Sequence, residues 1–342
     1  MKILVTGGCG FLGSHVCEFY VKKGAEVIAY DNMTKYELKR TGFIAEKARN
    51  YNWDYLNNLG VKAVRADVRN FEDLLENAQN CDYIIHTAAQ PAMTISWEDP
   101  LLDITTNVIG TFNVLEVARK LKIPVANCAT IHIYGNKTNE YLEEGEKRYL
   151  FDPKLIDENH PILEGTITPL HVSKSAGDAY VRAYIDTYKL EAASFRLTGI
   201  YGTRQFGGED HGWVANFAIR SMLGWPINIY GTGKQVRDII YATDVCEAFD
   251  AFYKTRKAGF YNIGGGEKTA ISLLECIDIL EEILGKKLEI NFAPDRHGDL
   301  KYFVCNTKKA EKDLRWSPNV MPKDGIKNLI YWIKENKEIF AK

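Results

Sequence analysis

The chain has 342 residues, which is long enough for about two domains of roughly 150 residues each. Its 43 basic and 45 acidic side chains give a formal net charge of -2. This balance argues against a general nucleic-acid partner, because such proteins need a basic excess to bind phosphates. No run approaches the roughly 18 apolar residues of a membrane-spanning helix, so we expect no membrane partner.

The seven cysteines are scattered, and none stands in a Cys-x-x-Cys pair. This spacing favours reduced thiols in a protein core over a disulfide framework, and no bound metal is expected. The first apolar run passes directly into glycines and lacks the long apolar region and the cleavage site of a signal peptide. The sequence therefore predicts a cytoplasmic protein.

In the N-terminal half, short apolar runs rich in β-branched residues alternate with amphipathic stretches. Strands are expected at 2–6, 25–30, 61–66, 83–87 and 124–128, and helices at 13–23, 46–59, 71–78 and from residue 101 onward. Strands that are apolar on both faces and separated by helices indicate a parallel, doubly wound sheet. This is the Rossmann arrangement of the α/β class.

After about residue 195 the pattern loosens into glycine-rich connections and two further helices. We expect a smaller, mixed α/β substrate domain there, interleaved with the last elements of the first domain. The charged stretch 137–167 predicts a long surface excursion, either a lid or a partner contact. The expected division is a cofactor-binding domain of 1–195, to which 236–262 return, and a nucleotide-sugar-binding domain of 196–235 and 263–342.

A glycine-rich turn, Thr6-Gly7-Gly8-Cys9-Gly10-Phe11-Leu12-Gly13, joins the first expected strand to the first expected helix. Gly7, Gly10 and Gly13 let the chain turn tightly, approach a pyrophosphate and pack helix against strand. The helix N-terminus offers N–H groups and the positive end of its dipole to the phosphates. Asp31 ends the second expected strand, where its carboxylate can accept from a ribose hydroxyl. Because the same charge repels the 2′-phosphate of NADP, the expected cofactor is NAD.

Three further charged residues leave alternatives open. Lys35 and Arg40 stand close to Asp31 in the sequence, and they either soften the preference for NAD or are solvated charges on a loop. Asp67 ends the third expected strand. It either binds the adenine amino group or caps the helix that begins at Phe71.

The T-G-x-x-G-x-x-G spacing resembles that of the extended short-chain dehydrogenase/reductases, the NAD-dependent epimerase and dehydratase group. Further motifs of this group follow in order along nearly the whole chain: His86-Thr87-Ala88-Ala89-Gln90, Ser96, Pro100, Asn107, Gly110-Thr111, Gly231 to Asp238, Tyr261-Asn262-Ile263-Gly264, Arg296 to Asp299 and Leu314 to Pro318. The resemblance implies NAD as cofactor. The cofactor-binding residues that it implies are Gly7, Gly10, Phe11, Leu12, Gly13, Asp31, Asn32, Asp67, Val68, Ala88, Ala89, Gln90, Asn107 and Lys174.

A narrower resemblance is carried by two stretches, 201–206 and 211–214, which are similar to the CDP-paratose (CDP-tyvelose) 2-epimerases. It implies a CDP-linked sugar as substrate and epimerisation at C2 by transient oxidation and re-reduction. Arginines suit a diphosphate because guanidinium groups bind phosphate oxygens bidentately, although each arginine also fits a surface ion pair. The implied substrate-binding residues are Gln90, Arg204, Gln205, Asn216, Arg237 and Arg296.

The family normally has a Ser or Thr after the fifth strand and a Tyr-x-x-x-Lys pair downstream, in which the lysine lowers the pKa of the tyrosine. Thr130 and Lys174 fill the first and last of these positions, but Leu170 stands where the tyrosine belongs. We expect His132 to replace it as acid/base, because an extended segment projects His132 and Thr130 on one face. His171 and a water relay are the alternatives.

Three functions remain open: an NAD-dependent nucleotide-sugar epimerase, an NAD(P)-dependent reductase or dehydrogenase of a nucleotide-linked sugar, and a non-catalytic binding protein. The retained Thr130 and Lys174 favour an enzyme, while Leu170 is the sole support for the binding protein. The resemblance also implies a homodimer built from two helices of each subunit. The candidate contacts, which fit a core equally well, are Ile104, Val108, Phe112 and Leu115.

Overall fold

Seven parallel strands form the central sheet of the molecule. The computed structural model describes residues 1–43 and 45–340, and its strands run in the order β12-β8-β5-β4-β1-β2-β3. β1 pairs with β2 on one side and with β4 on the other, so the winding reverses at β1. The predicted doubly wound sheet is confirmed. Its strands are β1 (Lys2–Thr6), β2 (Glu26–Asp31), β3 (Lys62–Arg65), β4 (Tyr83–His86), β5 (Val125–Thr130), β8 (Ala192–Leu197) and β12 (Gly259–Ile263).

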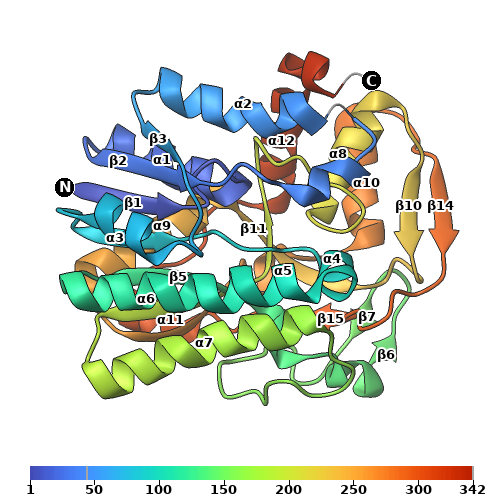
Figure 1. Cartoon of the computed structure of the whole chain (residues 1–342). Coiled ribbons are helices and arrows are strands. Elements are labelled where there is room, and N and C mark those ends of the chain that lie inside the picture. Colours follow the sequence, from blue (N-terminus) through green and yellow to red (C-terminus); the bar gives the residue numbers. More distant parts are fainter. Residues whose placement is uncertain (44, 341–342) are drawn as a thin grey trace.

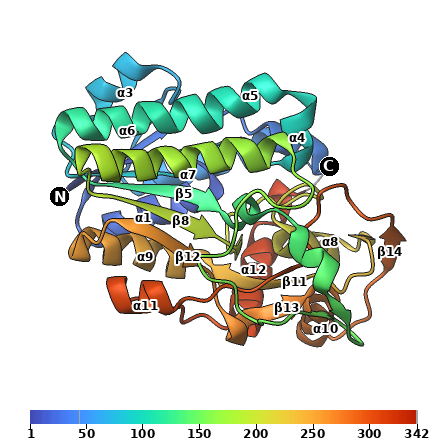
Figure 2. The same ribbon diagram turned by 90° about the horizontal axis from the view of Figure 1, so that it is seen from below.

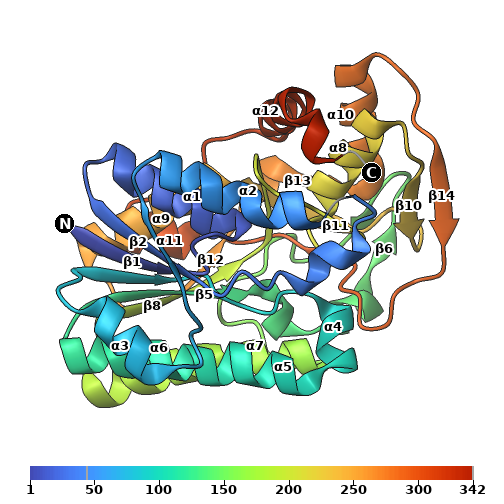
Figure 3. The ribbon, with the colours of Figure 1, turned by 45° about the horizontal axis from the view of Figure 1, so that its top comes forward.

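Helices cover both faces of this sheet (Figure 3). One face carries α1 (Phe11–Lys22), α2 (Ala45–Asn58), α9 (Ala242–Thr255) and α11 (Lys308–Leu314). The other carries α3 (Phe71–Ala78), α6 (Gly110–Leu121) and α7 (Pro169–Tyr188). After α4 (Met93–Glu98), α5 (Pro100–Ile104) continues through a π-helical turn at Thr105–Ile109 into α6. Figure 2 shows this composite rod lying alongside α7.

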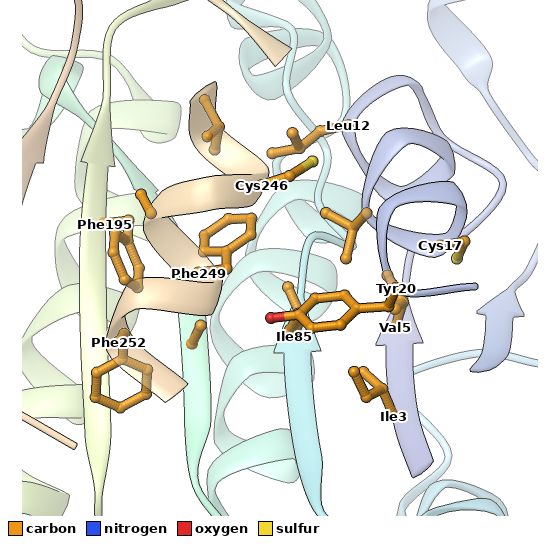
Figure 4. Close-up of a cluster of buried hydrophobic side chains, with 14 of the residues drawn as sticks. Ile3, Val5, Leu12, Cys17, Tyr20, Ile85, Phe195, Cys246, Phe249 and Phe252 are labelled. Carbon is orange, nitrogen blue, oxygen red and sulfur yellow. The ribbon is translucent and has the colours of Figure 1, made fainter. Parts of the chain in front are cut away.

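The core between the sheet, α1 and α9 is rich in aromatic side chains (Figure 4). Tyr20 on α1, Phe195 on β8 and both Phe249 and Phe252 on α9 are fully buried. The rings of Phe195 and Phe249 meet edge to face, with 5.0 Å between their centroids. Burial of such large side chains is the main favourable contribution to folding, so α9 docks on the sheet although it comes late in the chain.

A smaller unit lies at the end of the molecule away from the N-terminus (Figure 1). It contains one sheet in which β11 pairs with β9, β13 and β15, and a separate parallel pair of β10 and β14. Helices pack around both. The elements are β9 (Gly199–Tyr201), α8 (Trp213–Leu223), β10 (Ile227–Tyr230), β11 (Val236–Tyr241), β13 (Ala270–Ser272), α10 (Leu273–Leu284), β14 (Ile290–Ala293), β15 (Tyr302–Phe303) and α12 (Pro322–Glu335).

The expected domain boundaries need two corrections. Within 236–262, α9 and β12 join the large sheet as expected, but β11 lies in the smaller unit because its pairing partners are β9, β13 and β15. In addition, α11 was expected in the substrate domain. It packs Ala310 and Leu314 into the core beside α9 instead, because these apolar side chains face the large sheet.

The stretch 137–167 is a surface excursion that is fastened to the smaller unit. Its strands β6 (Glu143–Glu144) and β7 (Tyr149–Leu150) form a short hairpin. Arg148 binds Glu275 of α10 at 2.5 Å, and Lys147 binds Asp278 of the same helix at 2.6 Å. The expectation of a lid is therefore replaced by that of a fixed excursion.

The seven cysteines are free thiols, and all are buried except Cys128, which is partly exposed. Within residues 1–43 and 45–340, no helix combines the length and the apolar character needed to cross a bilayer. In the same part of the chain, no three His, Cys, Asp or Glu side chains are grouped so that they could hold a metal ion.

Candidate active site

A cavity of about 960 Å³ opens at the carboxyl ends of the central strands. Its wall on this side includes Gly7 after β1, Asp31 of β2, Thr87 after β4 and Thr130 of β5, and the smaller unit supplies the opposite wall. Ligands of open α/β sheets bind at this edge, at the point where the winding reverses. Among the residues that the structure describes, none of 137–167 lines the cavity.

Glycines close the turn between β1 and α1 where a side chain has no room. Gly7 has a φ of +66°, and a Cβ there would lie 2.6 Å from the backbone nitrogen of Ala88. A Cβ on Gly13 would lie 2.1 Å from the carbonyl oxygen of Gly7. Gly10 caps α1, whose first turn has no acidic side chain, and Gly10 and Phe11 line the cavity. The helix N-terminus is therefore open to an anionic ligand such as a pyrophosphate.

Asp31 presents a fixed carboxylate at the cavity wall. Its Oδ2 accepts from the backbone N–H of Cys9 at 3.0 Å, and its Oδ1 accepts from that of Met33 at 2.8 Å. The remaining lone pairs suit a ribose hydroxyl. Lys35 donates instead to the carbonyl oxygens of Cys9 and Arg49, at 2.6 and 3.1 Å. These residues fit NAD better than NADP. The Asp31 carboxylate repels a 2′-phosphate, and the Lys35 ammonium is directed to backbone carbonyls instead of to the position of such a phosphate.

Asp67 does not cap α3, so that alternative is wrong. Asn70 is the capping residue, and its Oδ1 accepts from the backbone N–H of Asp73 at 3.3 Å. The Asp67 carboxylate accepts from the Asn32 amide at 3.0 Å and pairs with Arg69 at 2.7 Å. Burial raises the pKa of Asp67, but these hydrogen bonds outweigh it and lower the pKa to about 2.

Arg40 is an exposed charge that pairs with carboxylates other than that of Asp31. Its guanidinium pairs with Glu98 of α4, contacts Asp210 at 3.1 Å and donates to the Thr94 hydroxyl at 2.9 Å. Thr94 and Asp210 line the cavity. Arg40 therefore joins the loop after β2, α4 and the loop before α8 at the edge of the cavity.

We expect Arg40→Ala to raise the dissociation rate of bound NAD by about three- to tenfold. Each exposed ion pair contributes up to roughly 1 kcal/mol, and the variant loses two together with one hydrogen bond. Exchange of retained NAD against labelled NAD measures the rate. The control is Arg182→Ala, which removes an exposed pair with Asp186 on α7. Equal rates for the two variants would show that Arg40 does not retain the cofactor.

The residues of the Tyr-x-x-x-Lys position lie at the start of α7. Pro169 begins the helix, so Leu170 and Lys174 are one turn apart on the same face. Leu170 and Thr130 both line the cavity. The Lys174 ammonium donates to the carbonyl oxygen of Cys128 on β5 at 3.3 Å, and burial lowers its pKa. Leu170 leaves an apolar surface where the family has a hydroxyl.

His132 and Thr130 share the cavity wall, but for a different reason from the expected one. Residues 131–134 form a 3-10 turn instead of an extended segment, because the Thr130 hydroxyl caps the turn and accepts from the His132 N–H at 3.3 Å. Burial lowers the pKa of His132 to about 3, and the charge of Arg237 contributes to this shift. Its imidazole is thus neutral at neutral pH and can accept a proton.

His171 is fully buried and is not among the described residues that line the cavity. Its Nδ1 accepts from the backbone N–H of Thr168 at 3.0 Å and contacts the Thr168 hydroxyl at 2.8 Å, which caps α7. The ring lies edge-on to His132, with 5.6 Å between centroids. Nδ1 of His132 and Nε2 of His171 are buried without a hydrogen-bond partner among the described residues. His171 therefore packs against the His132 ring without being one of the described residues that line the cavity.

A buried polar network connects Gln90, which follows β4, with the α5–α6 rod and the first turns of α7. The amide of Asn107 exchanges hydrogen bonds with the backbone of Gln90 at 2.9 and 3.1 Å, and also contacts Ser173 at 3.1 Å. Asp103 accepts from the side chains of both Gln90 and Asn107, at 2.9 and 3.0 Å. Sequence reasoning missed Asp103 and Ser173. The spacing of Asp103 and Asn107, one helical turn apart, was a signal for the former.

Two of the three arginines expected at the substrate, Arg204 and Arg237, have different surroundings. The Arg204 guanidinium is committed to Glu18 at 2.7 Å and to the Ser14 hydroxyl at 3.2 Å. Arg237 is largely but not fully buried and donates to backbone carbonyls, and the carboxylate nearest to it, that of Asp299, is 3.9 Å away. Burial lowers the pKa of Arg237. The positive charge of Arg204 is neutralised by Glu18, whereas that of Arg237 is only partly offset by Asp299. Arg237 is therefore the better phosphate ligand of the two.

Most residues expected at the site contribute to one cavity. The expected cofactor residues that line it are Gly7, Gly10, Phe11, Leu12, Asp31, Asn32, Val68, Ala88, Ala89 and Gln90, and the substrate residues are Gln90, Arg204, Gln205, Asn216, Arg237 and Arg296. Gly13, Asp67, Asn107 and Lys174 are not among its described lining residues.

Comparison with known proteins decides the family. Residues 3–264 match the model of the NAD dependent epimerase/dehydratase family. The chain belongs to this family. The enzyme is 34% identical to CDP-paratose 2-epimerase of Salmonella typhi, over 97% of its own length and 99% of that protein. It is also 34% identical to a putative UDP-glucose 4-epimerase of Methanocaldococcus jannaschii, over 98% and 99% of the two chains.

Solved structures agree with this assignment. The UDP-glucose 4-epimerase of Thermus thermophilus, in complex with NAD, superposes on the enzyme with a TM-score of 0.80 and 31% identity, over 98% and 99% of the chains. The UDP-glucuronic acid 4-epimerase of Bacillus cereus, in complex with UDP-glucuronic acid and NAD, gives 0.81 and 29%, over 98% and 100%. NAD is the cofactor of the enzyme, and the glycine turn and Asp31 fit it.

Proposed function

We propose that the enzyme epimerises C2 of a CDP-linked sugar by transient oxidation and re-reduction. The observation that carries the proposal is the cavity in which Asp31, Thr130 and Arg237 face one continuous space. Lys174 lies one helical turn after Leu170, which lines the same space. Similarity to CDP-paratose 2-epimerase supports the CDP-linked substrate and the position of reaction. Burial of the cysteine thiols and a nucleotide-sugar substrate are consistent with a cytoplasmic enzyme.

NAD would be held at the glycine turn and at Asp31, and it would supply the hydride acceptor and donor. The Thr130 hydroxyl orients the sugar hydroxyl that loses its proton, and Lys174 holds the nicotinamide ribose. His132 takes the proton at a ring nitrogen and gives it back. Burial is the main cause of the low pKa of His132 and the Arg237 charge adds to it, so a bound diphosphate, which offsets that charge, shifts the pKa of His132 upward. Arg237 and Arg296 hold the diphosphate.

Retention of a carbon-bound label tests this chemistry. The substrates are CDP- and UDP-linked hexoses carrying deuterium at C2, incubated with the NAD-loaded enzyme. The proposal expects product epimer that keeps the deuterium at C2, without consumption of added NAD(H). Loss of the label to water would indicate proton abstraction from carbon instead of hydride transfer. Stoichiometric turnover of NAD(P)H would establish the net reductase or dehydrogenase, which the missing tyrosine at Leu170 favours.

We also propose a homodimer through the exposed face of the α5–α6 rod and α7. Leu101, Ile104 and Phe112 are exposed there, as are Val172 and Tyr180 on α7. Leu115, one of the expected contacts, is fully buried in the core and takes no part. Contiguous exposed apolar side chains indicate an interface.

Ile104→Glu is expected to shift the enzyme from dimer to monomer in analytical ultracentrifugation, because it places a charge in an apolar interface. The matched control is Tyr331→Glu, an exposed apolar-to-acidic change on α12. A monomeric wild type, or a dimer that persists in the Ile104 variant, would contradict the proposed interface.

A further inference from the structure

A carboxylate that the reaction does not use faces the cavity from the loop before α8. Glu209 lines the cavity and lies between β9 and α8 in the chain. Its Oε1 accepts from the Asn228 amide at 2.6 Å, and its Oε2 accepts from the Tyr230 hydroxyl at 2.7 Å. The Arg220 guanidinium is 3.6 Å from Oε1. These contacts fix the direction of the carboxylate and leave lone pairs on both oxygens.

The position of Glu209 along the cavity follows from Tyr230. The Arg296 guanidinium lies over the Tyr230 ring, 3.9 Å from its centroid. The hydroxyl of the same tyrosine donates to Glu209. Arg296 and Arg237 are the phosphate ligands of the proposed function. Tyr230 therefore lies between Arg296 and Glu209, so the Glu209 carboxylate is next to the phosphate ligand Arg296, on the side of the Tyr230 hydroxyl.

Aromatic side chains of α8 add an apolar wall to the same cavity. α8 packs against β10, and Trp213 and Phe217 of α8 line the cavity with their rings 5.7 Å apart. A nucleoside diphosphate whose phosphates bind Arg237 and Arg296 has its reacting sugar on one side and its base on the other. With the sugar at Thr130, the base extends past Arg296 toward Tyr230 and Glu209.

We propose that Glu209 selects cytosine over uracil in the nucleotide sugar, an inference that rests on the proposed function. The exocyclic amino group of cytosine is a hydrogen-bond donor and matches an ionised carboxylate. Uracil presents a carbonyl oxygen at the same place, and two acceptors repel each other. Asn228 and Tyr230 act as positioning residues, because their hydrogen bonds orient the carboxylate.

Binding of free CDP and UDP tests the inference without any reaction. Dissociation constants are measured by calorimetry on the full chain saturated with NAD. The wild type is expected to bind CDP about tenfold or more tightly than UDP, the discrimination of one well-placed base contact. In Glu209→Gln the ratio is expected to fall toward one or invert, because a glutamine amide can donate to uracil. Glu282→Gln removes the same charge from α10, where Glu282 forms an exposed pair with Lys323 outside the described lining of the cavity, and is expected to keep the ratio.

Each other outcome overturns the inference in a distinct way. If the wild type prefers CDP and Glu209→Gln keeps the ratio, Glu209 only fastens the loop to β10, and the cytidine specificity of the proposed function stands. If the wild type binds CDP and UDP alike, the inference falls together with the CDP-linked substrate. Epimerisation by hydride transfer remains tested separately by retention of the deuterium label. Equal effects in Glu209→Gln and Glu282→Gln would assign the change to net charge.

Discussion

Replacement of His132 by glutamine is expected to lower kcat for epimerisation by about 10²- to 10⁴-fold, the usual contribution of a general acid/base. The variant should still bind NAD and CDP, because neither Asp31 nor Arg237 is altered. The assay is turnover of the nucleotide sugar that the label experiment identifies. His171→Gln is the comparison. It should cost about 1 kcal/mol of stability through the lost cap of α7 and affect turnover less.

The tyrosine that the family normally carries provides a rescue. Leu170 lines the cavity one turn before Lys174, so Leu170→Tyr places a phenol in the expected position. We expect this change to restore turnover in the His132→Gln background by at least tenfold. Full activity of His132→Gln would exclude His132 as the acid/base. A double variant as inactive as the single one would show that a phenol at 170 cannot reach the reacting hydroxyl.

Gly13→Ala is expected to abolish retention of NAD and to destabilise the fold by roughly 1–3 kcal/mol through overpacking. The added Cβ meets only backbone, at 2.1 Å from the Gly7 carbonyl oxygen and 2.8 Å from the Gly8 Cα, so no side-chain movement relieves it. The turn must open, and α1 then moves away from the pyrophosphate position. Released nucleotide after acid treatment and the thermal midpoint are the readouts.

The matched control is Gly24→Ala at the other end of α1. Gly24 has a φ of +80° and nothing within 4 Å of the added Cβ. The control should therefore lose only about 1–2 kcal/mol from the left-handed conformation and keep its NAD. Retained NAD in Gly13→Ala would contradict the close packing of the glycine turn. The milder Gly10→Ala, with its Cβ 2.9 Å from Gly7, is available if Gly13→Ala does not fold.

The strand, glycine turn and helix at the N-terminus were predictable because each depends on a short stretch of sequence. Apolar runs mark β1 and β2, and glycine is required wherever a Cβ meets backbone. The parallel, doubly wound character of the sheet followed from the alternation of strands and helices. In contrast, the placement of β11 was not predictable, because it is decided by partners that lie distant in the chain.

The directions of the polar side chains were the least predictable feature of the site. Arg204 stands in a motif expected at the substrate, yet it pairs with Glu18, 186 residues away in the sequence. Arg40 pairs with Glu98 and Asp210, which lie on two other segments. The sequence around Glu209 does not predict the direction of its carboxylate, because its partners Asn228 and Tyr230 lie on β10. Long flexible side chains select partners only after the backbone is assembled.

Native mass spectrometry of the enzyme, purified without added ligand, tests most directly whether it works through an internal oxidation and reduction. The account predicts about one NAD per chain, and nucleotide released by acid should be NAD and not NADP. An enzyme that retains its cofactor can return the hydride to the same sugar. A chain that carries no nucleotide, or one that carries NADP, would contradict the account.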